Sequence, residues 1–127
     1  MKSRVINEPV YLQDIMPTTL ELAGVDKPKH VEFNSVIPML KGGKSPYEKI
    51  YGCYLDKQRS IRTDKYKLIA YPKASVLRLY DIESDPLESE DLASKATMKP
   101  VMKELFADLQ DLQKTMNDKV DLSALAP

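Results

Sequence analysis

The sequence predicts an α+β fold in which a small antiparallel sheet of about four strands is packed by a C-terminal amphipathic helix. Two patterns favour this class. Short β-branched and aromatic runs alternate with brief turns between residues 47 and 81, and apolar residues recur at steps of three and four between residues 97 and 117. Prolines and glycines between residues 25 and 46 indicate a long connection after an N-terminal helix. We expect the 127 residues to form one module.

The N-terminal helix is expected to end at Gly24, a residue type that commonly follows a helix. Asp14 can cap it, and Pro17 falls in the first turn, where its missing N–H does no harm. Its apolar positions are Ile15, Met16, Leu20, Leu22 and Ala23. In the connection, residues 36–40 can form one packed turn. Helix and connection together occupy residues 1–46.

Strand-like runs fill residues 47–81. They cover residues 50–55, 59–63, 66–71 and 76–80. The short loops between them favour an antiparallel meander, because parallel strands need long crossovers. Arg59 and Arg62 are an odd number of positions apart, so they should point to opposite faces. Cys53 lies within the first run and has no obvious base beside it, so we expect a small buried hydrophobe.

The terminal helix is expected over residues 97–117. Its apolar stripe consists of Met98, Val101, Met102, Leu105, Phe106, Leu109, Leu112 and Met116. Thr97 is a plausible cap, and Pro100 falls in the first turn. The stripe needs a partner, and one face of the meander supplies it.

Charge and composition argue against several partners. Lys plus Arg and Asp plus Glu both total 19, so a general nucleic-acid binder, which needs a basic surplus, is not expected. No apolar run is long enough to span a bilayer. Residues 1–4 are not followed by the apolar stretch of a signal peptide. The only cysteine cannot form an intrachain disulfide, which leaves the redox compartment undecided.

The residues alone leave the function open. Carboxylates cluster at Asp81, Glu83, Asp85, Glu88, Glu90 and Asp91. A calcium-binding EF-hand starting at Asp81 would need Gly and Glu where Pro86 and Leu92 stand, so we expect a solvated turn. His30, the only histidine, cannot assemble a metal site, and it is better interpreted as a loop residue or a substrate contact. The basic residues of the meander are either ordinary surface charge or a contact for a sulfate or carboxylate. They are Lys57, Arg59, Arg62, Lys65 and Lys67.

Four segments, in order, resemble the C-terminal part of the formylglycine-dependent sulfatases. They are Gln13–Gly24, which is similar to an Asp-Ile-x-Pro-Thr helix ending in Ala-Gly; Asn34–Gly42, similar to a Ser-x-x-Pro-x-Leu connection; Gln58–Ile69, similar to an Arg-x-(Ile/Val)-Arg-x-x-x-Tyr-Lys-Leu-Ile hairpin; and Leu79–Ala93, similar to Leu-Tyr-Asp-Leu-x-x-Asp-Pro-x-Glu-x-x-Asn-Leu-Ala. Asn34 and Asp91 depart slightly from the family pattern. The resemblance spans most of the chain and implies the same α+β fold.

The resemblance also implies that the catalytic parts lie upstream, in a missing N-terminal catalytic domain. The family makes its formylglycine from a Cys/Ser-x-Pro-x-Arg motif, and Cys53 is followed by Tyr54, Leu55 and Asp56 instead. We therefore expect no catalytic residue, metal ligand or cofactor in this chain, and calcium and formylglycine only in the upstream part. The family's substrates would be a sulfated glycan or an aryl sulfate. The family is often exported, but no location is assigned to this chain.

Three functions are weighed. The first is the C-terminal portion of a sulfatase, inactive alone, which completes the fold and the wall of the substrate cleft. The substrate-contact candidates are His30, Asp56, Lys57, Gln58 and Arg59. The second is a free-standing interaction or sulfated-glycan-binding module, with possible self-association through an exposed apolar face. The third, an unrelated enzyme using His30 or Cys53, is disfavoured because neither residue has a visible partner.

Overall fold

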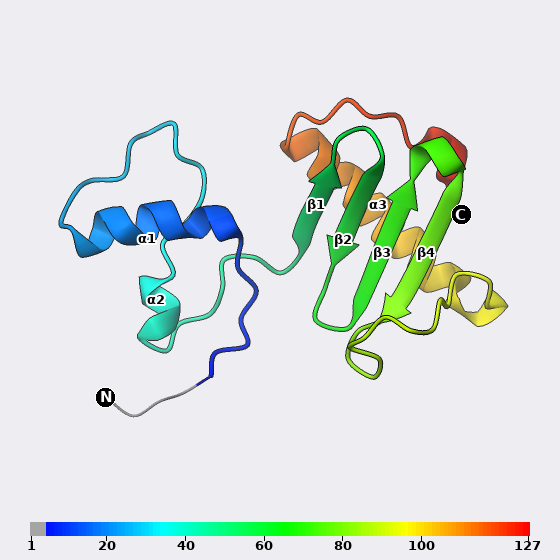
Figure 1. The fold of residues 1–127 in the computed structure, drawn as a ribbon, viewed down its shortest axis with the longest axis horizontal. Coiled ribbons are helices and arrows are strands. Elements are labelled where there is room, and N and C mark those ends of the chain that lie inside the picture. Colours follow the sequence, from blue (N-terminus) through cyan, green and yellow to red (C-terminus); the bar gives the residue numbers. More distant parts are fainter. Residues whose placement is uncertain (1–4) are drawn as a thin grey trace. The chain divides into compact units, whose positions relative to one another are not determined.

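The chain contains two compact units, Met1–Ile50 and Tyr51–Pro127 (Figure 1). The computed structural model describes residues 5–127. Residues 1–4, on which the prediction of no signal peptide rests, lie outside the described residues. Whether the whole chain acts as one module stays a prediction.

The first unit is built from short helices. A 3₁₀ turn at Leu12–Asp14 leads into α1 (Ile15–Leu22), and α2 (Ile37–Leu40) forms the expected single packed turn. Gly24 has φ +68°, and the Val25 N–H donates to the Leu20 carbonyl at 2.9 Å, so α1 ends at a left-handed glycine as predicted.

The second unit contains the predicted four-stranded antiparallel meander. Its strands are β1 (Ile50–Tyr54), β2 (Gln58–Arg62), β3 (Tyr66–Tyr71) and β4 (Val76–Asp81), in the order β1-β2-β3-β4. The register places Ile61 beside Leu68 and Leu68 beside Leu79. These three fully buried side chains form the centre of the core.

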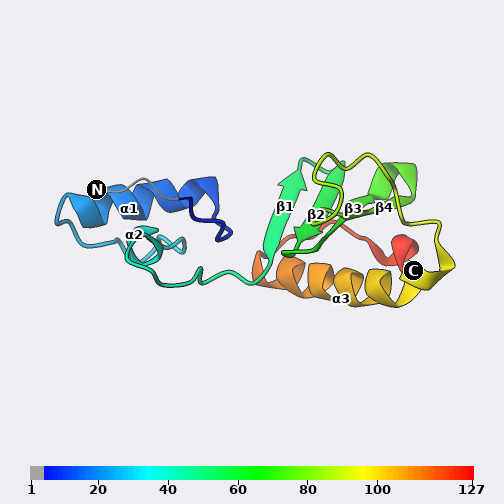
Figure 2. The same ribbon diagram turned by 90° about the horizontal axis from the view of Figure 1, so that it is seen from below.

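Helix α3 (Lys99–Thr115) covers one face of this sheet (Figure 2). It buries four residues of the predicted stripe against the sheet: Met102, Leu105, Phe106 and Leu109. Met116 is 41% exposed because it lies after the last turn. The capping prediction was wrong for α3, since Thr97 lies in a 3₁₀ turn before that helix. Asp14 is the N-cap residue of α1 as predicted, but its carboxylate makes no capping hydrogen bond to the helix.

Candidate functional site

Four of the five predicted substrate contacts lie at one end of the sheet. Asp56 and Lys57 are exposed in the turn between β1 and β2, and half-buried Gln58 and buried Arg59 begin β2. The turn is tight: the Lys57 N–H donates to the Tyr54 carbonyl at 3.0 Å. Leu55, in the same turn, has a φ of +48°. The hairpin therefore brings these candidates together.

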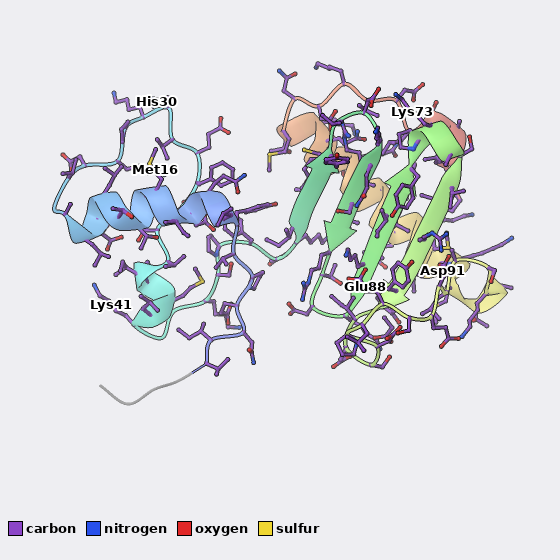
Figure 3. All side chains as sticks on the ribbon, viewed as in Figure 1. Met16, His30, Lys41, Lys73, Glu88 and Asp91 are labelled. Atoms are coloured by element: carbon purple, nitrogen blue, oxygen red, sulfur yellow. The ribbon has the colours of Figure 1, made fainter. Side chains whose placement is uncertain are left out.

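An ion pair joins this turn to the next hairpin. Lys73, in the 3₁₀ turn between β3 and β4 (Pro72–Ala74), lies 2.5 Å from the Asp56 carboxylate, and Figure 3 labels it at this end of the sheet. The hydrogen bond from Lys73 lowers the pKa of Asp56. Both side chains are more than half exposed, so water screens the pair and it stabilises the fold little.

Arg59 points inward and forms an ion pair with Asp118. Its Nε and Nη2 atoms donate to the two carboxylate oxygens, and Tyr51 donates its hydroxyl to Oδ2 of the same carboxylate. The Nη1 atom donates to the Leu55 and Gln58 carbonyls at 2.5 and 2.8 Å. Every one of these bonds stays within the second unit. We call Tyr51, Arg59 and Asp118 the carboxylate clasp.

The clasp shifts the pKa of each of its members. The guanidinium of Arg59 holds the pKa of Asp118 well below its usual range, while burial and the bond to Asp118 raise the pKa of Tyr51. The bond to Asp118 likewise raises the pKa of Arg59. Arg59 thus stays charged and ordered between β2 and the segment after α3.

The predicted face assignment of the two arginines is confirmed. Arg59 shares the buried face of β2 with Ile61, whereas Arg62 is exposed. That inward position gives Arg59 a structural role, the ion pair with Asp118. Its contact with a substrate stays a prediction, as do those of Asp56, Lys57 and Gln58.

His30 belongs to the first unit, where it is exposed in a turn (Figure 3). Its predicted role in binding a substrate also stays a prediction. The expectation for Cys53 was wrong: its side chain is exposed, because β1 is an edge strand and the C-terminal end of that strand is open to solvent.

The acidic segment after β4 uses its carboxylates to shape its own backbone. Asp81 accepts from the Ser84 N–H at 3.1 Å, and Asp85 accepts from the Glu90 N–H at 2.8 Å. Asp91 accepts from the Leu79 N–H at 3.1 Å on the open edge of β4. Residues 5–127 contain no group of three or more His, Cys, Asp or Glu side chains that could hold a metal ion.

Glu88 completes this loop from the outer face of the sheet. Its carboxylate accepts two bonds from Lys67 of β3, at 2.7 and 2.8 Å, and Figure 3 shows it beside the lower end of the strand. An ion pair therefore holds the acidic segment to the sheet, and the Lys67 side chain in this pair is 25% exposed.

Two acidic residues with large structural roles were missed by the sequence interpretation. Asp118 was not singled out at all. Asp14 was expected only as a cap, yet it is fully buried and accepts from the Tyr11 N–H at 2.8 Å, the Asn34 N–H at 3.0 Å and the Tyr47 hydroxyl at 2.6 Å. Neither has a clear local sequence signal, because all of their partners except the nearby N–H groups of Tyr11 and Val120 are 20 to 67 residues away.

No helix within residues 5–127 combines the length and apolar character needed to cross a membrane. This finding agrees with the absence of a long apolar run in the sequence.

Comparison with known proteins gives a consistent result. The profile of the family described as N-sulphoglucosamine sulphohydrolase, C-terminal, matches residues 1–115. An N-acetylglucosamine-6-O-sulfatase of Bacteroides thetaiotaomicron is 30% identical over 118 residues, which cover 83% of this chain and 21% of the relative. An uncharacterised protein of Haemophilus influenzae is 28% identical over 118 residues, which cover 88% of this chain and 60% of the relative.

A solved structure of a protein in complex with its substrate D-glucosamine-2-N,6-O-disulfate is similar with a TM-score of 0.75 and 30% identity. The likeness covers 87% of this chain and 25% of that one. This chain therefore spans about a quarter of the solved protein and a fifth of the Bacteroides relative.

Proposed function

This chain belongs to the family of N-sulphoglucosamine sulphohydrolase C-terminal domains, and from that premise we propose that it serves as the C-terminal portion of a sulfatase. The supporting observation is the match of residues 1–115, together with the fold shared with a substrate-bound protein. The enzyme as a whole would hydrolyse sulfate esters of a carbohydrate or an aryl compound. In it, the present segment would complete the fold and one wall of the substrate cleft.

The hydrolytic chemistry would belong to a separate catalytic portion. We propose that this portion supplies calcium and formylglycine, as the resemblance to the formylglycine-dependent sulfatases implies. Cys53, although exposed, is followed by Tyr54, Leu55 and Asp56 and lacks the proline and arginine of the formylglycine motif. The chain alone would then be inactive toward sulfate esters.

A chromogenic aryl-sulfate assay on the purified chain, with added calcium, tests inactivity directly. We expect no turnover above that of buffer. Mass spectrometry of the same sample should show Cys53 as an unmodified cysteine. Sustained turnover that persists after repurification would overturn the proposal, since it would require a complete catalytic site within these residues.

Within the second unit, we propose that the exposed end of the β1–β2 hairpin contacts the substrate. Lys57 is exposed and carries the positive charge that attracts a sulfate, and half-buried Gln58 lies beside it. Nuclear magnetic resonance titration with a sulfated glucosamine disaccharide should shift the amides of residues 55–58. Lys57→Ala should weaken the shifts, whereas Lys103→Ala, which removes an exposed charge on α3, should not. Equal effects of both substitutions would indicate nonspecific charge attraction.

A second candidate function is a free-standing interaction or sulfated-glycan-binding module. It is favoured by the Haemophilus influenzae relative, in which the similar segment makes up 60% of the chain. Such a module would bind a sulfated glycan with no catalytic portion present. Isothermal titration calorimetry of the chain with heparin fragments distinguishes the two functions, because a dedicated binding module requires tight binding by the chain alone, whereas one wall of a cleft would give only the weak contact followed by the amide shifts above.

A further inference from the structure

The turn between β1 and β2 has a backbone conformation that its own residues do not favour. Leu55 has a φ of +48°, in the left-handed region that residues other than glycine seldom adopt. Such a conformation persists where the surrounding structure holds it in place. The bond from the Lys57 N–H to the Tyr54 carbonyl closes the turn but leaves the Leu55 carbonyl to be held by another group. We call residues 55–58 the hairpin tip.

Arg59 is the group that holds this carbonyl. Its Nη1 atom donates to the Leu55 carbonyl at 2.5 Å and to the Gln58 carbonyl at 2.8 Å, so one nitrogen bridges the first and last residues of the hairpin tip. The guanidinium is planar and rigid, so its orientation fixes the direction of both carbonyls. The Arg59 side chain is only 6% exposed, so it supports the hairpin tip from the interior of the unit.

Asp118 in turn orients the guanidinium. Its two carboxylate oxygens accept from Nε and Nη2 of Arg59, which leaves Nη1 for the two carbonyls. The Tyr51 hydroxyl and the Val120 N–H hold the same carboxylate in place. The match to the family profile ends at residue 115, so it does not include this acid, which lies on the segment that follows α3 at the hairpin-tip end of the sheet (Figure 1).

We propose that Asp118 is a positioning residue for substrate binding, because through Arg59 it holds the hairpin tip in one conformation. The inference rests on the proposed function, in which Lys57 and Gln58 at this tip contact a sulfated sugar. A turn that is already ordered loses less conformational entropy on binding than a mobile one, and the difference appears as affinity. Arg59 acts through the turn, since all three of its side-chain nitrogens bond to protein oxygens.

The positioning role and simple electrostatics predict opposite effects of Asp118→Asn. The substitution removes a negative charge, so it would strengthen the attraction of a sulfate if Asp118 acted only through its charge. It would also release the guanidinium of Arg59 to pair with the sulfate. If Asp118 instead orders the hairpin tip, the same substitution weakens binding.

Nuclear magnetic resonance titration of the whole chain with the sulfated glucosamine disaccharide gives the dissociation constant from the amide shifts of residues 55–58. We expect Asp118→Asn to raise this constant roughly threefold to tenfold, because the mobile tip must be ordered on binding. Without ligand, the heteronuclear NOE of the same amides should fall, which reports faster local motion. Each variant is measured at a temperature at which circular dichroism shows it to be folded.

Leu109→Ala is the control for a purely structural effect. It removes a fully buried apolar side chain of α3, so it destabilises the fold without removing a hydrogen bond of the carboxylate clasp. The dissociation constant and the NOE of residues 55–58 should stay at their wild-type values. A rise in the constant equal to that of Asp118→Asn would show that affinity follows overall stability, and it would overturn the positioning role.

Arg59→Lys tests the bridge in a variant that keeps a cation beside Asp118. The single ammonium group lacks the fork that bonds a carboxylate and both carbonyls together, so binding should weaken although the net charge is unchanged. Unchanged or tighter binding by Arg59→Lys or by Asp118→Asn would overturn the positioning role and leave the contact by Lys57 standing. An absence of shifts in the wild-type chain would overturn the proposed contact and this inference with it.

Discussion

The Nη2 atom of Arg59 lies 3.0 Å from Oδ1 of Asp118, which follows it by 59 residues. Their side chains are only 6% and 14% exposed. Asp118 also accepts from the Val120 N–H at 3.0 Å, so one carboxylate anchors both the side chain from β2 and the backbone after α3. The C-terminal segment is thereby tied to the sheet that α3 covers.

Replacing Asp118 by Ala should strongly destabilise the second unit. The change leaves the buried guanidinium of Arg59 without its counter-ion, which typically costs about 3–5 kcal/mol. Urea denaturation followed by circular dichroism measures the unfolding free energy. Asp111→Ala is the control, since its pair with Lys114 is 73% and 77% exposed and should contribute little. Similar losses of unfolding free energy for both variants would show that the carboxylate clasp stabilises the fold no more than an exposed ion pair does.

The same carboxylate predicts a loss of stability in acid. The pKa of Asp118 is held below its usual range in the folded chain, chiefly by the bond from Arg59. Its contribution is therefore complete above the unfolded pKa of about 4 and falls as the pH drops toward the folded pKa. The difference in unfolding free energy between wild type and Asp118→Asn should be constant from about pH 7 to pH 5 and shrink below about pH 4. A difference that grows in acid would contradict the depressed pKa.

Asn117 should tolerate glycine better than valine. It has φ +53° just after α3, where its N–H donates to the Lys114 carbonyl at 3.0 Å and the Asp118 N–H donates to the Gln113 carbonyl at 2.9 Å. This is the Schellman arrangement that ends a helix in a left-handed residue. Asn117→Val should lower the unfolding free energy by about 1 kcal/mol or more, because β-branched residues avoid positive φ, whereas Asn117→Gly should be nearly neutral. Thermal denaturation of the Asn117→Val and Asn117→Gly variants measures this difference in stability, and equal melting temperatures would contradict the prediction.

Most of the fold could be predicted because its signals are local. The helix period between Val101 and Leu112 and the strand runs on either side of the Asp64-Lys65 turn each reflect neighbouring residues. The exposure of Cys53 could not be predicted, because the alternation of residues within a strand does not show which strand lies at the edge of the sheet or how far the core extends. Burial at that position depends on the sheet order.

The location of the candidate site could be predicted from the sequence, but the ion pair between Arg59 and Asp118 could not. The tight turn brings Asp56 through Arg59 together, as a hairpin at that spacing requires. That Arg59 would turn inward to Asp118 depends on a contact across 59 residues, which no local pattern encodes. A signal was nevertheless available: an arginine in phase with buried Ile61 needs a buried acidic partner.

Removing Asp14 should loosen the first unit and release Tyr47. Burial, followed by the hydrogen bond to Asp14, raises the pKa of Tyr47. Asp14→Ala leaves the N–H groups of Tyr11 and Asn34 without their acceptor, so their hydrogen exchange should accelerate. The pKa of Tyr47, obtained from the tyrosinate absorbance difference between Asp14→Ala and Asp14→Ala/Tyr47→Phe, should fall toward its ordinary value. Asp26→Ala, an exposed loop substitution, should change neither observable.

Gly52 and Ser60 form a pair in which the effect of one substitution depends on the other. A Cβ at Gly52 would lie 2.5 Å from the Ser60 Oγ atom, so Gly52→Ala forces the Ser60 hydroxyl into another rotamer or the two strands apart, and it should lower the unfolding free energy by about 1 kcal/mol. In the Ser60→Ala background that oxygen is gone, and the remaining contact to the Ser60 Cβ is an ordinary 3.9 Å. Gly52→Ala should then be neutral or slightly stabilising, because alanine loses less backbone entropy than glycine on folding.

A double-mutant cycle by urea denaturation measures this coupling between β1 and β2. The cycle should give a coupling energy of about 1 kcal/mol, favourable in the double variant. Additive effects would show that the Ser60 hydroxyl does not limit the approach of the two strands. Because β1 is joined to the sheet only through β2, a measured coupling would also report how firmly the edge strand that carries Cys53 and Tyr54 is held.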